Sequence, residues 1–186
     1  MSDADQPPSP DTLTDHLRNG EHDAALACLD QLTEADAETR RRTLRAAEAV
    51  ADDRPDAFDG LAAQVGTFLT DDDRAVRLTT AKLLVALAES LPGTVLPVVD
   101  SLAARLADEA EFYFVRARCA EALGYVALDH PGEVIDPSML ADLRVGLSFD
   151  RPAVKEKLAK ALASVALGDP GRLRHQVGSL AEHLSD

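Results

Sequence analysis

The residues that most often do chemistry are histidines, cysteines and clustered carboxylates, and this 186-residue chain has few of them in useful arrangements. The five histidines include no His-Glu pair, and His175 and His183, eight residues apart, lack the closer spacing and the carboxylate of a metal motif. Neither Cys28 nor Cys119 has a second cysteine nearby, so both are expected to be small core residues. No phosphate loop, nucleophile elbow or cysteine-histidine arrangement is present. The sequence therefore predicts no enzyme, no cofactor and no metal ion.

Three consecutive carboxylates, Asp71, Asp72 and Asp73, are the acidic run that could suggest a cation site. No octahedral set of oxygen ligands accompanies them. Carboxylates that stand directly before a helix far more often cap its N-terminus and interact with its dipole. We therefore expect helix capping here, with a metal ion as the minor alternative.

The elements that would position functional side chains are repeated helices. The stretch from Asp73 to Pro92 is predicted as a helix with acidic residues in front and a proline behind, and its pattern occurs four times. In every copy a basic residue stands fifteen positions before the closing proline. These basic residues are Arg40, Arg77, Arg116 and Lys155, and the prolines are Pro55, Pro92, Pro131 and Pro170. Such regularity predicts a repeat protein.

The copies resemble HEAT repeats, most clearly in Asp73, Val76, Arg77 and Ala81, followed by the apolar pair Leu83-Leu84. The resemblance is to the compact archaeal and bacterial type. It implies an all-α, armadillo-like fold: an α-solenoid of stacked antiparallel helical hairpins. In that family the helix preceded by aspartate is the second of each pair.

The predicted organisation is a disordered tail at 1–10 and a single solenoid domain at 11–186. A short helical cap at 11–20 precedes about four helix pairs within 21–167, and a closing helix follows at 171–184. The predicted pairs are 22–32 with 37–52, 56–69 with 73–90, 93–106 with 111–128, and 137–147 with 151–167.

A helical wheel places the positions 17, 13, 10 and 6 before each proline on the side opposite the apolar arc. The resemblance implies that this side faces the concave groove of the solenoid. The predicted partner-binding groove consists of Arg42, Arg45, Lys82, Phe114, Arg118, Tyr125, Lys157 and Lys160. Its excess of cations suggests an acidic protein partner, with the two aromatic residues as anchors.

Simpler interpretations stand beside this one. Acidic neighbours could neutralise the cations of the groove, which would then have no binding role. The side chain of Phe114 could turn inward, because the run Phe112-Tyr113-Phe114 blurs the start of its helix. For the ladder of Arg40, Arg77, Arg116 and Lys155, a structural role is expected, in which each side chain bonds the acidic turns between helices.

Composition suggests the cellular setting. The formal net charge is −14, and Asp is preferred to Glu and Arg to Lys. We interpret this as adaptation to a salt-rich cytosol, as in a haloarchaeal cell, with an ordinary acidic mesophilic protein as the alternative. Neither a signal peptide nor a membrane span is evident, so a soluble cytoplasmic protein without a membrane partner is expected.

Two functional hypotheses follow. The preferred one is a non-enzymatic protein-binding scaffold or adaptor, since a solenoid offers a long concave surface. The alternative is a nucleic-acid binder, or a base-repair enzyme similar to the HEAT-like glycosylases, in which the cations would contact phosphates. The acidic net charge and the absence of tryptophan count against that alternative. The oligomeric state is left open.

Overall fold

The computed structural model describes residues 8–130 and 133 of the chain, and every regular element in this part is helical. The prediction of an all-α protein is confirmed for these residues. The chain forms two compact units, residues 1–97 and residues 98–186.

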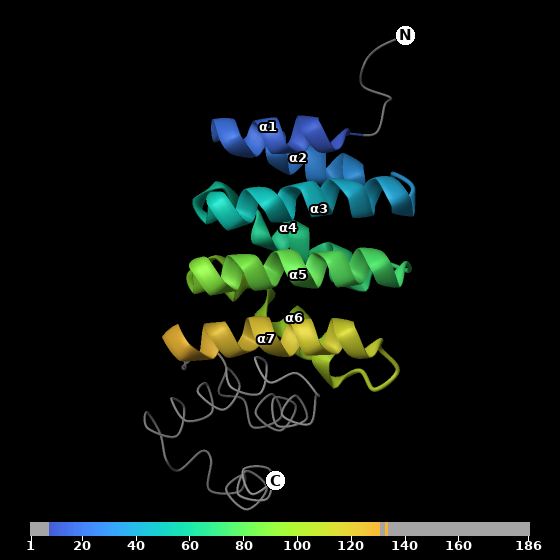
Figure 1. Ribbon diagram of the computed structural model, residues 1–186, viewed down its shortest axis with the longest axis vertical. Coiled ribbons are helices and arrows are strands. Elements are labelled where there is room, and N and C mark those ends of the chain that lie inside the picture. Colours follow the sequence, from blue (N-terminus) through green and yellow to red (C-terminus); the bar gives the residue numbers. More distant parts are fainter. Residues whose placement is uncertain (1–7, 131–132, 134–186) are drawn as a thin grey trace, which may run out of the picture. The chain divides into compact units, whose positions relative to one another are not determined.

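Unit 1 is built from two layers of helices. Figure 1 shows α1, α3 and α5 side by side and running in the same direction, with α2 and α4 behind them. The elements are α1 (Pro10–Asn19), α2 (His22–Leu32), α3 (Ala37–Asp53), α4 (Ala62–Thr67) and α5 (Arg74–Ser90), with the 3₁₀ helices η2 (Pro55–Phe58) and η3 (Phe68–Thr70) on either side of α4, and η4 (Pro92–Val98) after α5.

Local signals set where α1 begins and ends. Ser9 is its N-cap, and the Ser9 hydroxyl accepts the backbone N–H of Thr12 at 3.2 Å. Gly20 ends the helix at a φ of 71°, a left-handed conformation that glycine adopts without strain. Residues 8–10, which were predicted to be part of a disordered tail, therefore include the cap and the first residue of α1.

Large aliphatic side chains from both layers form the core of unit 1. Leu13, Leu29, Leu44, Leu69 and Leu84 are each at most 1% exposed. Burying a side chain of this size contributes about 1.5–3 kcal/mol to folding. Because α3 packs against α1 on one side and α5 on the other, the buried apolar side chains of α3 join the three helices of this layer.

Two helices predicted as continuous are interrupted, and those predictions were wrong. The predicted helix 56–69 is divided at Gly60, which has a φ of 75°. The predicted helix 93–106 begins as the 3₁₀ helix η4 and becomes α-helical only at Val99. Pro97 explains the second interruption, since it donates no backbone hydrogen bond and disfavours an α conformation in the residue before it.

Unit 2 contains α6 (Val99–Ala107) packed against α7 (Tyr113–Asp129). Leu102 and Leu106 of α6 and Leu123 of α7 are fully buried. A tight turn joins the two helices, closed by the backbone N–H of Glu111 donating to the carbonyl of Asp108 at 3.0 Å. The predicted pairing of 93–106 with 111–128 is thus seen for α6 and α7.

The predicted pair 137–147 with 151–167 and the closing helix 171–184 lie outside the described residues. Within the described residues, no helix has both the length and the apolar character needed to cross a membrane.

Candidate partner-binding surface

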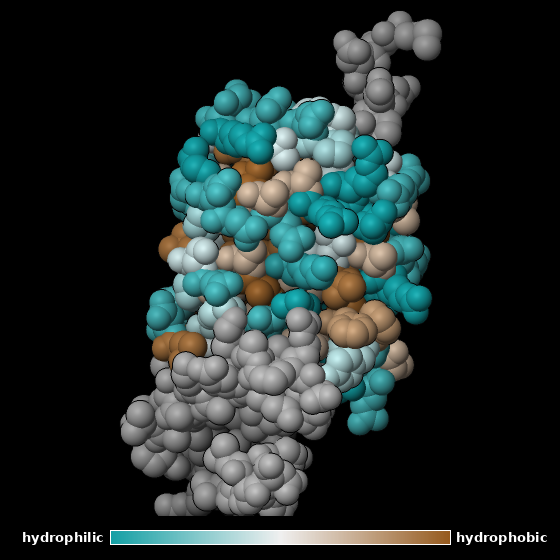
Figure 2. Space-filling model, viewed as in Figure 1, coloured by the Kyte–Doolittle hydropathy of each residue, from teal (hydrophilic) through white to brown (hydrophobic). Residues whose placement is uncertain are grey.

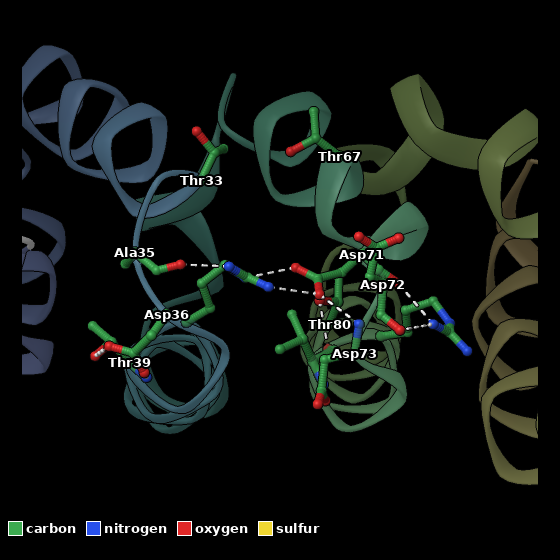
Figure 3. Close-up of polar contacts among 12 residues, drawn as sticks. Thr33, Ala35, Asp36, Thr39, Thr67, Asp71, Asp72, Asp73 and Thr80 are labelled. Atoms are coloured by element: carbon green, nitrogen blue, oxygen red, sulfur yellow. Dashed lines mark hydrogen bonds and ion pairs between the residues drawn. The ribbon is translucent and has the colours of Figure 1, made fainter.

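An aspartate at the same repeat position fixes the N-terminus of both α3 and α5. Asp36 Oδ1 accepts the backbone N–H of Thr39 at 2.9 Å, and Asp73 Oδ1 accepts those of Val76 at 3.1 Å and Ala75 at 2.7 Å (Figure 3). These bonds stabilise the charged carboxylates and so lower the pKa of both aspartates. The capping role predicted for Asp73 is confirmed.

Arg40 joins two successive turns of unit 1. Its guanidinium donates to the carbonyl of Ala35 in the turn before α3, and its Nη2 donates to Asp71 Oδ1 at 2.9 Å in the turn before α5 (Figure 3). Arg40 Nε lies 2.7 Å from the second carboxylate oxygen of Asp71. The two side chains are only 17% and 7% exposed. This two-point contact fastens α3 to the turn from which α5 starts.

Arg77 and Arg116 repeat part of this arrangement. Arg77 Nη1 donates to the carbonyl of Asp71 at 2.7 Å, and Arg116 Nε donates to the carbonyl of Leu106 at 2.9 Å. Arg40 and Arg77 thus bond the turn that precedes their own helix, whereas Arg116 bonds the last turn of α6. The predicted role of bonding the turns between helices is confirmed for Arg40 and Arg77. Arg116 bonds the end of the preceding helix instead, and Lys155 lies outside the described residues.

Two of the three carboxylates that could have suggested a cation site, those of Asp71 and Asp73, are already engaged. Asp71 accepts the backbone N–H of Asp73 at 2.8 Å in addition to its contact with Arg40, and Asp73 caps α5. In residues 8–130 and 133, no three His, Cys, Asp or Glu side chains are placed to hold a metal ion.

The unit 1 part of the predicted groove is an exposed stripe on α3 and α5. Arg42, Arg45 and Lys82 are exposed, while the opposite sides of these helices are buried. Figure 2 views the layer of α1, α3 and α5 from outside and shows hydrophilic side chains over α3. Within the described part of the chain, these three cations have no hydrogen bond or ion pair. We call Arg42, Arg45 and Lys82 the cationic stripe.

The unit 2 part of the predicted groove is different. Arg118 Nη1 lies 2.5 Å from Glu121 Oε2, and the Glu121 side chain is only 8% exposed. For Arg118 the structure therefore favours the charge-compensation interpretation. Tyr125 is half-buried, and Phe114 is 46% exposed, so the suggestion that Phe114 turns inward is wrong. Lys157 and Lys160 lie outside the described residues.

Sequence reasoning noted the run Phe112-Tyr113-Phe114 but did not predict that these rings form a cluster at the start of α7. Phe112 occupies the repeat position that Asp36 and Asp73 occupy in the other helices, and it provides no side-chain cap. Its ring centroid lies 5.3 Å from that of Phe114, which lies 5.4 Å from that of Tyr113. The signal was the replacement of the capping aspartate by phenylalanine, which an alignment of the four copies displays.

The two cysteines and two of the histidines have structural surroundings. Both cysteines are buried, as predicted, and burial raises the pKa of Cys28 to about 11 and that of Cys119 to about 12. His16 Nδ1 lies 2.5 Å from Glu21 Oε2, and His22 Nδ1 lies 3.2 Å from the carbonyl oxygen of Asp59. The thiols are therefore poor nucleophiles, and the two histidines contact different partners.

Comparisons with known proteins bear on the fold alone. No protein-family profile matches the chain, and no curated protein matches it. Among solved structures, the chain is similar to the crystal structure of an engineered protein, with a TM-score of 0.61 and 19% sequence identity. The similarity covers 80% of this chain and 68% of the engineered one.

Proposed function

We propose that the chain is a HEAT-like α-solenoid that serves as a non-enzymatic protein-binding scaffold, with the cationic stripe as part of its binding surface. The observation that carries this proposal is the state of Arg42, Arg45 and Lys82. All three are exposed and unpartnered within the described residues, although the whole chain has 33 acidic and 19 basic residues. Cations that form no ion pair among the described residues, in a chain so rich in carboxylates, are available to a partner.

The neighbours of the cationic stripe suit recognition better than catalysis. The other positions on the same faces of α3 and α5 include Ala49, Ala75 and Ala86, which are small. Small side chains let a partner backbone approach the helices while the long cations reach over it. The stripe provides charge and access, but it contains no nucleophile and no general base.

Nucleic acid is the second candidate, because the same cations could contact phosphates. Its signature would be a steep fall of affinity with salt, set by the number of phosphates neutralised. A carboxylate-bearing protein segment would also bind more weakly in salt, so sensitivity to salt alone does not separate the two. The two candidates are separated by a competition experiment at one salt concentration, in which protein partners compete with labelled DNA for binding to the chain.

The experiment that tests the proposal is affinity capture from cells of the source organism after nuclease treatment. The bait variant carries Arg42→Glu, Arg45→Glu and Lys82→Glu together. The matched control is Arg18→Glu, another exposed arginine, whose side chain has no hydrogen bond or ion pair among the described residues and whose backbone carbonyl accepts from Arg54 Nη1 at 3.2 Å. We expect a protein partner that the wild type and the control capture and the triple variant does not. Capture that depends on nucleic acid, or that the triple variant retains, would contradict the proposal.

A further inference from the structure

The two central cations of the cationic stripe lie at matching points on neighbouring helices. Arg45 and Lys82 both stand ten positions before the closing proline, and each is the ninth residue of its 17-residue helix. Figure 1 shows α3 and α5 side by side and running in the same direction. Equal positions along two such helices make Arg45 and Lys82 lateral neighbours. The axes of packed helices lie about 8–10 Å apart, so the backbone positions of Arg45 and Lys82 are separated by about that distance.

Carboxylates limit the stripe along the helix axes. Asp52 and Glu89 are exposed and stand seven residues after Arg45 and Lys82, which corresponds to about 10 Å of helix. At the other end of α3, the exposed Glu38 lies 2.7 Å from Arg41. An acidic ligand that followed either helix would meet these carboxylates within a few turns, whereas one that crossed from α3 to α5 would meet a second cation.

We propose that the cationic stripe binds an acidic protein segment that crosses α3 and α5 in an extended, polyproline II conformation with carboxylates three residues apart. This inference rests on the proposed function and specifies the partner. A polyproline II chain rises about 3.1 Å per residue and returns to the same side every third residue, so such carboxylates lie about 9 Å apart on one side. That repeat matches the spacing of the two helices. A β-strand would turn the third residue to the opposite side.

The test uses two labelled peptides of identical composition, titrated into the full chain at low ionic strength. One consists of Asp-Pro-Pro triplets, and the other has its aspartates contiguous and its prolines on either side. We expect the triplet peptide to bind about five- to tenfold more tightly, since only its carboxylates match both cations. Arg45→Gln and Lys82→Gln should each weaken its binding about two- to fivefold, whereas the control Arg18→Gln should leave it unchanged.

Every other outcome would contradict the proposed crossing geometry, and each one identifies which part of the proposal is wrong. Equal affinity for the two peptides, with both weakened by Arg45→Gln and Lys82→Gln, would leave the proposed function intact and reject the spacing. Equal weakening by Arg18→Gln would show nonspecific attraction to the whole chain. Absence of binding to either peptide would reject the inference, and if single-stranded DNA bound instead through the stripe, the proposed function would fail with it.

Discussion

The guanidinium of Arg40 and the carboxylate of Asp71 meet with Nε 2.7 Å from Oδ2, although the two residues are 31 positions apart in the sequence. The ladder arginine of one repeat therefore holds the turn that begins the patterned helix of the next. This contact ties the turn before α5 to α3, the two helices that carry Arg45 and Lys82.

Removing this link should destabilise the protein. We expect Arg40→Ala to lower the free energy of unfolding by about 2 kcal/mol, because it leaves a mostly buried carboxylate without its charged hydrogen-bond donor. The control is Arg42→Ala, two residues along the same helix, which should change stability by less than about 0.5 kcal/mol. Urea denaturation of both variants measures the difference, and equal effects would show that the Arg40 contact adds nothing.

A buried hydroxyl on α3 offers a substitution that should stabilise the protein. Thr43 is fully buried and its Oγ1 has no hydrogen-bond partner among the described residues, whereas the equivalent Thr80 of α5 donates to the carbonyl of Val76 at 2.9 Å. Thr43→Val removes an unsatisfied polar atom, so it should be more favourable than Thr80→Val by about 1 kcal/mol. The two melting curves test this, and a larger loss for Thr43→Val would contradict the contacts described.

Acid should weaken the two helix caps. The pKa values of Asp36 and Asp73 are lowered in the folded protein, so the unfolded chain binds protons more readily than the folded one. Their contribution is present above the ordinary aspartate pKa near 4 and is lost as the pH falls through the lowered folded values. Replacing both with asparagine retains a cap but removes the charge. We expect the stability of this double variant to depend less on pH below about 4, and an unchanged profile would place the acid sensitivity elsewhere.

The buried apolar positions of the patterned helices should be costly to truncate. Leu84 is fully buried and Leu91, on the same segment, is 41% exposed. We expect Leu84→Ala to cost about 2–5 kcal/mol. Leu91→Ala should cost well under half as much, because little packing is lost there. Similar losses at the two sites, measured by denaturant unfolding, would show that the burial described here is wrong.

The sequence predicted the long helices better than the short ones. The bounds of α2 matched, and those of α3 and α5 were within a residue, because an aspartate cap and a closing proline mark both patterned helices. The helix expected over 56–69 failed because apolar spacing was given more weight than Asp59-Gly60, where the left-handed glycine breaks the helix.

The candidate surface was predictable only in part. Wheel positions gave the exposure of Arg42, Arg45 and Lys82, since a period of 3.6 residues separates exposed from buried sides. The wheel positions could not give the pairing of Arg118 with Glu121, because they place both residues on one side of the helix while the distance between the two side chains depends on rotamers. The wheel positions also could not distinguish cations without a partner among the described residues from those bound to backbone carbonyls.

The salt dependence of stability addresses the interpretation of the acidic composition. If the excess of carboxylates is an adaptation to high salt, the melting temperature should rise from low-salt buffer to molar KCl, because screening relieves repulsion among carboxylates. Raising the osmolality equally with an uncharged solute is the control. A melting temperature that does not change with KCl would reject the adaptation.

The most direct test of the binding surface is the affinity of the identified protein partner for charge-reversed variants, measured by calorimetry with purified proteins. Arg45→Glu combined with Lys82→Glu should weaken binding at least about tenfold, since two attractions become repulsions, while the melting temperature stays close to that of the wild type. Arg18→Glu should leave the affinity unchanged. If the double variant binds as tightly as the wild type, the partner does not use the cationic stripe, and the account of α3 and α5 as the binding surface is wrong.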